Sequence, residues 1–563
     1  MRKYLLVITL VLLFSVFSFG QVLPQFINIH PTSTNVKYGG TLKWVQNAGP
    51  LTDDFNPFIN GIPPVTLIYE PLFYINELNN SITPLLGTAY EWEDNNLKLV
   101  VTVRNEVKWS DGTPFTASDV AFTFNYLKQY PAIDGAGIWS NISNLQSVVA
   151  SGDNVIFTFS KPNTPLFYYI AGVLIVPEHI WSNIKTPTTY MNPNPVGTGP
   201  FVFKNFNASN YVVTLVKNPN YWLSGRPYLD EIDFQSVLTN NTDLLYMLKG
   251  EYDGTYTNFI DPQTTWIKPD PQDHHMYWPT YDANILYLNC AKYPFNIPAF
   301  REAISLAINK PLLVKSAYFG ANGYDFNPTG VVPSQQSEWL DPTLSASANE
   351  LNNYNPQKAQ ALLASIGFTK DSAGNLVGPD GKELPTFKLD VGAGWQDYIT
   401  MGQIIGQELK MLGINMVVDQ QTTTYWSSMA TGEYDMAICW ETGTGPTPYY
   451  MYYQEFNPTF AATKIGQTAI SDFSWYTNPE ITNALTEYAN TSDPNVQKQA
   501  IYTIEKIVLR DVPFIILTNR TGYLEYSTAH FNGWPTDLDP YNIGTGFDFN
   551  AGGLVMALNL YLK

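Results

Sequence analysis

No Pro- or Ser-rich linker divides this chain of 563 residues. A single hydrophobic core stops growing well below that length, so the chain needs two or more domains. Strand-like and helix-like patterns are mixed along it, and no internal repeat or low-complexity tract is present. Domains without a linker are typical of a chain that crosses back and forth between them. We therefore expect two or more domains joined by more than one crossing segment.

The N-terminus carries an export pattern. Two basic residues precede an apolar run, Tyr4–Phe19, and small residues precede Gln21. This run is shorter than the roughly 20 residues that a spanning helix needs. The pattern predicts a secretory signal peptide over residues 1–20, with an uncleaved anchor as the alternative. The mature protein is then expected in the periplasm or another extracytoplasmic space.

Composition limits the chemistry of the partner. The formal net charge of −19 argues against nucleic acid as a partner. The only two cysteines, Cys290 and Cys439, end strand-like runs and are expected as buried thiols in preference to a disulfide. Of five histidines, His274 and His275 are adjacent and do not converge on one metal ion as an i, i+4 pair would. We expect no metal and no cofactor.

Several segments have clear secondary-structure signals. Thr116–Leu127 reads as a helix that Thr116 or Ser118 could cap, and two other helices end before Gly367 and Gly413. The predicted elements are helices over Thr116–Leu127, Pro298–Ile308, Pro356–Ile366 and Met401–Leu412, and strands over Leu97–Val103, Val155–Phe159, Ile285–Cys290, Phe387–Val391 and Tyr434–Trp440.

Four segments, in order along the chain, carry a family resemblance. They are Val107–Val120 (VKWSDGTPFTASDV), Pro195–Phe201 (PVGTGPF) with Lys217–Trp222 (KNPNYW), Phe300–Lys310 (FREAISLAINK) and Tyr354–Leu363 (YNPQKAQALL). The chain resembles the family 5 extracellular solute-binding proteins of ABC importers, which take up oligopeptides, dipeptides, nickel complexes and oligosaccharides. Asn309 stands where that family more often has Asp.

The resemblance implies a two-lobed α/β protein that closes around its ligand. The first lobe would comprise residues 21–280, with an extra subdomain over about 60–190, and the second lobe residues 281–512. Residues 513–563 would return to the first lobe. Within the first motif, Trp109 and the turn at Gly112 are expected to be structural.

Peptide-binding members of this family hold the ligand's amino terminus with an aspartate. The matching segment here is Cys439–Pro446, and Gly443 stands at the position of that aspartate. Glu441 is near but out of register, because alternate residues of a strand point to opposite faces. This departure weakens the peptide hypothesis.

The candidate ligand-binding residues are aromatic or carry amide and carboxylate groups, and they follow strands, where α/β sheets place ligands. These are Gln46, Asn47 and Asp53 after the first strand; Trp278 and Tyr281 near the crossover; Trp395, Gln396 and Asp397 after Phe387–Val391; and Trp426, Trp440, Tyr449 and Tyr450.

This set favours a neutral oligosaccharide, because flat rings cover the apolar face of a pyranose and polar groups satisfy its hydroxyls. The resemblance implies delivery to a membrane ABC permease, and we expect a monomer without enzymatic activity. A peptide ligand is the main alternative. A secreted glycoside hydrolase, which needs two carboxyls across a glycosidic bond, is less favoured. No Gly-x-Ser-x-Gly motif or phosphate-binding loop is present in the sequence.

Overall fold

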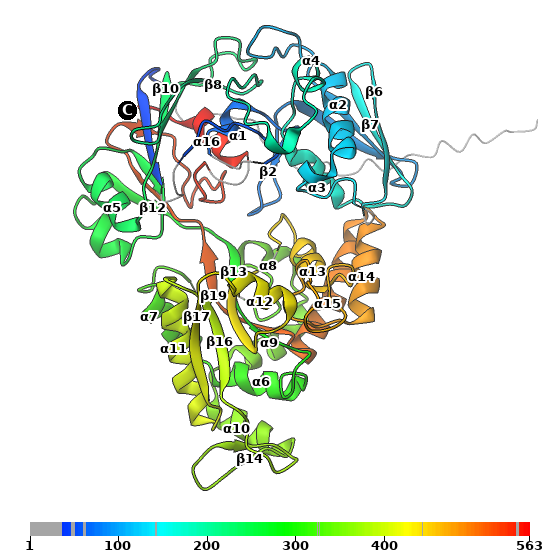
Figure 1. Ribbon diagram of the computed structural model, residues 1–563, viewed down its shortest axis with the longest axis vertical. Coiled ribbons are helices and arrows are strands. Elements are labelled where there is room, and N and C mark those ends of the chain that lie inside the picture. Colours follow the sequence, from blue (N-terminus) through cyan, green and yellow to red (C-terminus); the bar gives the residue numbers. More distant parts are fainter. Residues whose placement is uncertain are drawn as a thin grey trace, which may run out of the picture.

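The computed structural model describes residues 36–46, 51–59, 63–140, 143–323, 325, 327–441, 443–547 and 551–563. The predicted signal peptide and Asn47 lie outside these ranges. The described chain forms two bodies, one above the other in Figure 1. Within the described residues, no helix has both the length and the apolar character to cross a membrane.

The first lobe is built on a seven-stranded mixed sheet. Its central strand β1 (Thr41–Gln46) pairs in parallel with both neighbours, β10 and β11. The strand order is β12 (His274–Tyr277), β20 (Leu524–Ser527), β11 (Gly254–Tyr256), β1, β10 (Glu231–Ser236), β9 (Val212–Lys217) and β8 (Phe201–Asn207). The helices of this lobe and its insertion are α1 (Val65–Ile68), α2 (Ala117–Gln129), α3 (Leu166–Gly172), α4 (Glu178–Trp181), α5 (Asn240–Leu248) and α16 (Gly552–Asn559).

A separate antiparallel sheet lies between β1 and β8 in the chain. It has four strands, in the order β4 (Gly87–Glu93), β5 (Lys98–Val103), β7 (Asn154–Phe159) and β6 (Leu145–Ser151). Along β5 and β7 every second residue is buried, as in a sheet with one covered face. Helix α2 contacts β6 and β7 of this sheet. We call the region from β4 to α4 the insertion.

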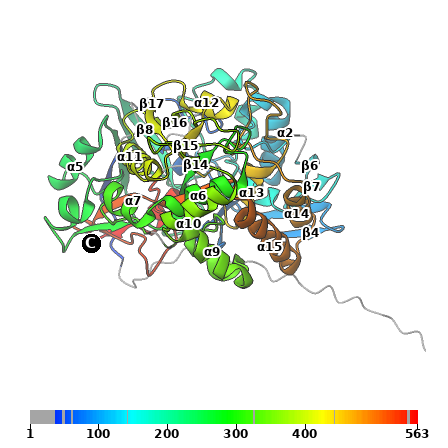
Figure 2. The same cartoon turned by 90° about the horizontal axis from the view of Figure 1, so that it is seen from below.

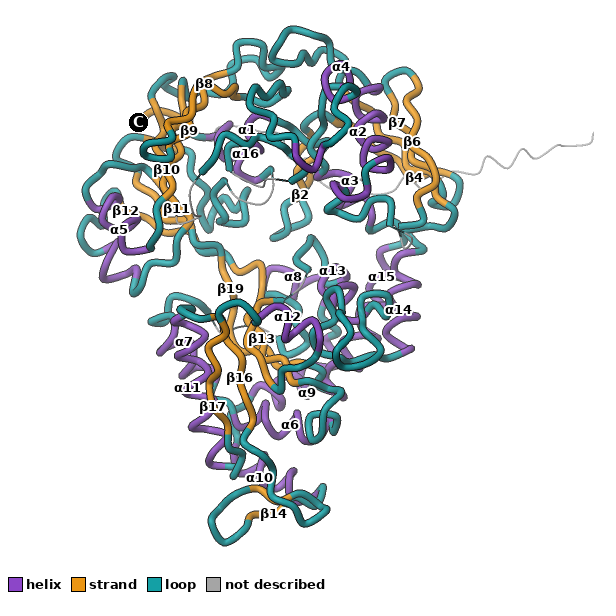
Figure 3. The backbone as a smooth tube through the Cα atoms, in the orientation of Figure 1, coloured by secondary structure: helices purple, strands orange, loops and turns teal. Residues whose placement is uncertain are grey.

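The second lobe contains a five-stranded sheet covered by most of the remaining helices (Figure 3). The strand order is β17 (Met416–Gln421), β16 (Phe387–Gly392), β18 (Met436–Trp440), β13 (Thr280–Leu288) and β19 (Phe514–Thr521). Its helices are α6 (Pro298–Ala307), α7 (Lys310–Ala317), α8 (Pro333–Trp339), α9 (Ser345–Asn352), α10 (Pro356–Ser365), α11 (Gln396–Met411), α12 (Tyr425–Thr431), α13 (Tyr449–Phe456), α14 (Pro479–Ala489) and α15 (Pro494–Asp511). Three two-stranded ribbons complete the described structure: β2 (Phe73–Ile75) with β3 (Ile82–Pro84), β14 (Thr369–Lys370) with β15 (Leu376–Val377), and β21 (Phe531–Asn532) with β22 (Tyr561–Leu562).

The chain passes between the two large sheets at two places. It leaves the first sheet after β12 and enters the second at β13, and it returns between β19 and β20. Strand pairing places this return later than the expected boundary after residue 512, because β19 pairs along β13 and belongs to the second sheet. Seen from below in Figure 2, α14 and α15 lie on the same side as the insertion sheet.

Most of the predicted helices and strands are present, and where their bounds differ from the prediction the cause is local. Thr116 caps α2, where its side chain and that of Asp119 form a reciprocal capping box. The helix expected from Met401 begins earlier, at Gln396, and Asp397 in its first turn suits the positive end of the helix dipole. Both cysteines are free thiols, as predicted.

The first family motif is structural in this protein, as predicted. Trp109 is fully buried, and its ring packs edge-on against Phe115 with centroids 5.9 Å apart. Gly112 has φ of +90° and donates its backbone N–H to the Trp109 carbonyl at 2.8 Å. A positive φ favours glycine at this turn.

One buried carboxyl makes the stability of the second lobe depend on pH. Glu505 of α15 accepts a hydrogen bond from the backbone N–H of Asp341 at 2.8 Å, and burial raises the pKa of its carboxyl to about 8. An unfolded glutamate titrates near pH 4.3, so the folded state binds the proton more tightly. Its stabilising contribution is therefore full below that pH and is lost as the pH rises toward 8.

We expect Glu505→Gln to keep the wild-type melting temperature at about pH 4 and to stabilise the protein at about pH 8 by roughly 1–3 kcal/mol. Differential scanning calorimetry at the two pH values measures this. Glu487→Gln, at an exposed position of α14, is the control and should change neither value. Equal stability of Glu505→Gln and the wild type at pH 8 would contradict the prediction.

Candidate ligand-binding cleft

Three of the predicted tryptophans form one aromatic cluster on the second lobe. Trp440 ends β18, Trp395 precedes α11 as its N-cap, and Trp426 lies in the first turn of α12. The ring centroid of Trp440 lies 5.5 Å from that of Trp395 and 5.2 Å from that of Trp426. Trp426 is 44% exposed, whereas the other two are partly buried. The cluster therefore combines exposed aromatic surface at Trp426 with packing on the core at Trp395 and Trp440.

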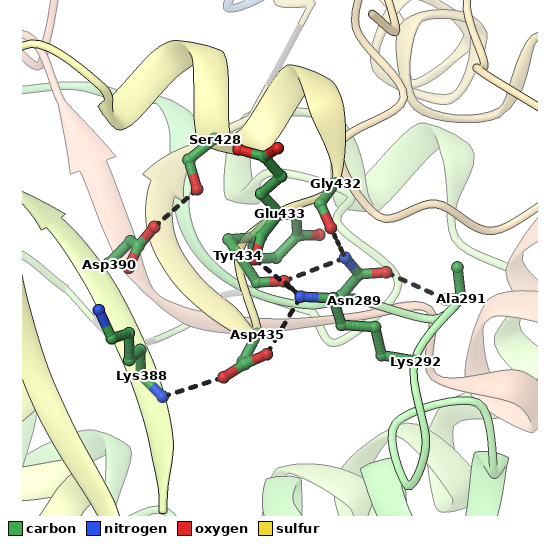
Figure 4. Close-up of polar contacts among 10 residues, drawn as sticks. All are labelled: Asn289, Ala291, Lys292, Lys388, Asp390, Ser428, Gly432, Glu433, Tyr434 and Asp435. Atoms are coloured by element: carbon green, nitrogen blue, oxygen red, sulfur yellow. Dashed lines mark hydrogen bonds and ion pairs between the residues drawn. The ribbon is translucent and has the colours of Figure 1, made fainter. Parts of the chain in front are cut away.

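A polar network fixes the helix that carries Trp426 (Figure 4). Ser428 Oγ of α12 donates to Asp390 Oδ2 of β16 at 2.9 Å. Asn289, just after β13, donates through Nδ2 to the backbone carbonyl of Gly432 at 2.8 Å. These bonds join the middle and the C-terminal end of α12 to β16 and to the residue after β13, so the position of Trp426 is set by the sheet.

A buried ion pair lies where the chain crosses between the lobes. Arg520 of β19 and Asp282 of β13 are cross-strand partners, and Arg520 Nη1 donates to Asp282 Oδ2 at 2.5 Å. Nη1 also donates to the Tyr281 hydroxyl at 3.2 Å. The guanidinium carbon lies 5.0 Å from the ring centroid of Trp440, within the range of a cation–π contact. Two predicted residues, Tyr281 and Trp440, thus meet at an arginine that sequence reasoning missed.

Carboxyl groups surround this arginine. Burial raises the pKa of Asp282, and the charge of Arg520 opposes the rise. Burial, then repulsion from Asp282 and Glu455, holds the pKa of Glu441 well above its usual range. The Glu441 Oε2 atom has no hydrogen-bond partner among the described residues. The site therefore has more acceptors than cations, which suits a ligand that donates hydrogen bonds.

A cavity of about 550 Å³ lies between the lobes beside Trp395. Two more predicted residues, Gln396 and Asp397, line it, and Asp397 Oδ2 accepts a hydrogen bond from the Tyr318 hydroxyl at 3.0 Å. Its volume falls within the roughly 300–1,000 Å³ of small-molecule sites. The first lobe contributes Thr239–Asn241 and Asn258–Ile260, and the second Ser316–Phe319, Gly394–Asp397 and Thr400.

Trp278 lies on the crossing segment between β12 and β13. Its indole Nε1 donates to Glu525 Oε1 at 3.1 Å, and its ring packs edge-on against Tyr523 with centroids 5.1 Å apart. Glu525 is on β20 of the first lobe. Trp278 therefore holds the crossing segment to the first lobe, and any ligand contact would involve its ring and not its N–H group.

The structure does not bring the other candidates into the aromatic cluster. Gln46 is buried in the first lobe, where its Oε1 accepts from Trp44 Nε1 at 2.8 Å. Asp53 is exposed. Tyr449 is buried, and its ring stacks on Tyr488 with centroids 4.4 Å apart. Contacts within the protein already explain the positions of Gln46 and Tyr449. A ligand-binding role for these two residues and for Asp53 stays a prediction.

Gly443 occupies a backbone position that a side chain does not fit. Its φ is +136°, and an added Cβ would lie 2.4 Å from Gln454 Cγ and 2.8 Å from the Tyr450 carbonyl oxygen. A residue with a Cβ would therefore need both an unfavourable φ and a shift of α13. The aspartate of peptide-binding relatives has no place at this position.

The lobes also touch at the insertion, far from the crossing segments. The Thr164 backbone N–H donates to the Ala489 carbonyl at 2.9 Å, and the Tyr450 hydroxyl donates to the Pro165 carbonyl at 3.1 Å. The rings of Tyr168 and Tyr450 lie 4.8 Å apart. We call this the α3–α13 contact. It holds the lobes together on one side with no ligand involved.

We expect Tyr450→Phe to loosen the α3–α13 contact, because it removes a buried hydrogen bond between the lobes worth about 1 kcal/mol. The Pro165 carbonyl keeps the backbone N–H of Tyr168 as a donor at 3.1 Å, so the variant leaves no unpaired acceptor. Small-angle scattering of the ligand-free protein should show a larger radius of gyration. Tyr452→Phe is the matched control, since that buried hydroxyl donates to Thr329 within the second lobe at 2.9 Å. A radius unchanged in both variants would contradict the prediction.

Several known binding proteins are similar to this chain in sequence and in structure. The periplasmic oligopeptide-binding protein of an ABC transporter from Thermotoga maritima is 27% identical and superposes with a TM-score of 0.83, covering 93% of this chain and 99% of that one. A mannohexaose-bound structure of the same protein gives a TM-score of 0.76, covering 93% and 98%. The glutathione-binding protein GsiB of Escherichia coli is 24% identical over 467 residues, 80% of this chain and 82% of its own.

The predicted two-lobed α/β fold is confirmed by these neighbours. The oligopeptide-binding protein AppA of Bacillus subtilis, solved with a nonapeptide, has the same fold at 20% identity, with a TM-score of 0.70 over 94% of this chain and all of that one. The family model for the middle region of bacterial extracellular solute-binding proteins, family 5, matches residues 81–462. Since the match covers more than half of the chain, the protein belongs to the family 5 bacterial extracellular solute-binding proteins.

Proposed function

We propose that this protein captures a neutral oligosaccharide, a β-linked gluco- or manno-oligosaccharide, between its lobes and delivers it to the membrane permease of an ABC transporter. It acts by binding and not by catalysis, as a monomer in the periplasm or another extracytoplasmic space. Its relatives are named as binding proteins, and one of them holds mannohexaose.

The aromatic cluster carries this proposal. Trp395 lies beside the amide of Gln396 and the carboxylate of Asp397 in the cavity, and the rings of Trp440 and Trp426 continue the aromatic surface from it. Aromatic rings beside polar groups are the combination that a pyranose ring requires. Covering about 100 Å² of apolar surface per ring at about 25 cal/mol/Å² contributes about 2.5 kcal/mol. Three such contacts approach the roughly 8 kcal/mol of a 1 μM complex, before the costs of association. No charge on the ligand is needed for this affinity.

Closure of the lobes is the physical step that retains the ligand. The cavity beside Trp395 has walls from both lobes, so a molecule in it contacts both. Such a ligand binds the closed arrangement more tightly than an open one and shifts the population toward closure. The two crossing segments provide the hinge, and the closed form is the one that the permease would receive.

A peptide is the second candidate, and one observation favours it. Glu441 is buried two residues before Gly443, where the family resemblance implies an aspartate that holds a peptide amine, and its Oε2 has no partner among the described residues. A ligand ammonium could pair with that carboxylate. GsiB is named for glutathione, and AppA was solved with a nonapeptide. Gly443 argues against this candidate, because the family's usual anchor has no room there.

Isothermal titration of the mature protein, from Gln21 onward, separates the two candidates. The ligands are manno- and cello-oligosaccharides of two to six units, α-linked glucose oligomers, monosaccharides and di- to pentapeptides. We expect micromolar binding to one β-linked series, with a rise in melting temperature at saturation. Binding to peptides alone would refute the sugar proposal and make Glu441 the first anchor to mutate. Release of product from a chromogenic glycoside would refute the non-catalytic role.

A further inference from the structure

We propose that Arg520 binds the ligand directly, by donating a hydrogen bond from its guanidinium to a hydroxyl oxygen of a sugar beside Trp440. This contact would couple ligand binding to movement of the lobes at the hinge. This inference depends on the proposed function, and the two can fail separately. Arg520 is on β19, immediately before the chain returns to the first lobe.

The guanidinium has donors that the protein does not use. Nη1 donates to Asp282 and to the Tyr281 hydroxyl, whereas Nε and Nη2 have no acceptor among the described residues. The side chain is only 20% exposed. Neither nitrogen is among the fully buried atoms that lack a partner, so both N–H groups remain open to an acceptor on a ligand. The guanidinium carbon lies over the Trp440 ring, 5.0 Å from its centroid, so a ligand beside that ring would be within reach of these donors.

The surrounding charges select the kind of acceptor. Asp282 already neutralises Arg520, and the carboxyls of Asp397 and Glu441 interact with it electrostatically. A ligand carboxylate would therefore add negative charge to an acidic site. A hydroxyl suits the site better, because it accepts from the guanidinium and donates to a carboxylate at once. This chemistry favours a neutral polyhydroxylated ligand over an anionic one.

The same side chain joins the two crossing segments. Its ion pair connects β19 to β13, and Tyr281, which accepts its hydrogen bond, packs in a small cluster with Leu78 and Ile543. Leu78 lies between β2 and β3, and Ile543 lies after β20, so both belong to the first-lobe side of the hinge. A ligand bound to Arg520 therefore contacts a residue that is bonded to Asp282 and Tyr281 on the crossing segment, and the packing around these two residues would change when the lobes move. The contact ties ligand recognition to closure.

Arg520→Lys tests this role while keeping the charge beside Asp282. A lysine has no planar fork, so it loses the donors and the stacking on Trp440 together. We expect binding of mannohexaose or cellohexaose, whichever the wild type binds more tightly, to weaken at least tenfold by calorimetry. Scattering should show less compaction when that sugar is added. The melting temperature of the ligand-free variant should stay close to that of the wild type.

A second variant and a control separate ligand reading from folding. The double variant Arg520→Met with Asp282→Asn removes both charges, which leaves no unpaired buried charge, and it should fold and yet bind at least tenfold more weakly. Arg510→Lys changes an arginine whose partner is the neighbouring Asp511, with Nε 2.8 Å from its Oδ1, and should bind like the wild type.

Wild-type affinity in folded Arg520→Lys would overturn the role of Arg520 and leave the oligosaccharide proposal standing. A wild type that binds only peptides would overturn the proposed function. In that case, loss of tetrapeptide binding in Arg520→Lys would still support ligand reading by this residue, and retention would refute it. A wild type that binds neither class would refute both.

Discussion

Replacement of Trp426 by alanine is expected to weaken oligosaccharide binding by about 50- to 100-fold. The side chain is 44% exposed at the edge of the aromatic cluster, so much of its ring is available to a ligand. Loss of about 100 Å² of apolar contact corresponds to about 2.5 kcal/mol, and each 1.4 kcal/mol is a factor of ten in affinity. Titration calorimetry with the best-binding oligosaccharide measures the loss.

The exposed position of Trp426 makes this a test of binding and not of folding. We expect the melting temperature of Trp426→Ala to change little, because the ring of Trp426 covers less of the core than those of its neighbours Trp395 and Trp440. Trp92→Ala is the matched control, since Trp92 is partly buried in β4 of the insertion and packs against Phe159 with centroids 5.4 Å apart. Equal affinity in Trp426→Ala and Trp92→Ala would refute stacking on the cluster.

Introducing the family's aspartate through Gly443→Asp is expected to destabilise the protein and not to create a peptide site. The substitution combines a φ of +136° with a Cβ 2.4 Å from Gln454 Cγ. Backbone strain and overpacking each cost roughly 1–3 kcal/mol, so we expect a loss of roughly 2–5 kcal/mol and a melting temperature lower by about 5–15 °C. Thermal melting gives the loss, and titration with a tripeptide tests for a gained site.

Gly374→Ala separates strain from crowding. Gly374 also has a positive φ, +88°, but nothing lies within 4 Å of an added Cβ. Its substitution should therefore cost only the strain, about 1 kcal/mol. If Gly443→Asp proves no more destabilising than Gly374→Ala, the crowding at α13 is overestimated. Tight peptide binding by Gly443→Asp would show that the second lobe can still use the family's anchor.

Local patterns were sufficient to predict many elements of the fold. The capping residue Thr116 and the alternating burial of β5 follow from side chains near in sequence. The four motifs were enough to predict the family and a two-lobed chain. The position of the return crossing was predicted too early, because Phe514–Thr521 could pair with either sheet and only its contact with β13 decides. Pairing of distant strands is not encoded in local periodicity.

For the cleft, the sequence identified residues of a suitable type but could not show which of them lie close together. Trp395, Trp426 and Trp440 were all predicted as ligand contacts, and the structure places their rings together. Gln46 and Tyr449 look similar in the sequence but are packed in the core. Arg520 escaped notice, although a charged residue in the apolar strand Phe514–Thr521 was a usable signal.

Side-chain chemistry and short-range periodicity depend on neighbours along the chain, so the sequence was enough for the α/β class, the family, the free thiols and a set of candidate aromatic ligand contacts. The ion pair of Arg520 with Asp282 joins residues 238 positions apart, and the α3–α13 contact joins Thr164 to Ala489. Such long-range contacts depend on how the two sheets are arranged and on where the chain crosses between them. Only the tertiary structure could therefore decide which candidate aromatic residues lie together and which residue links them to the crossing segments.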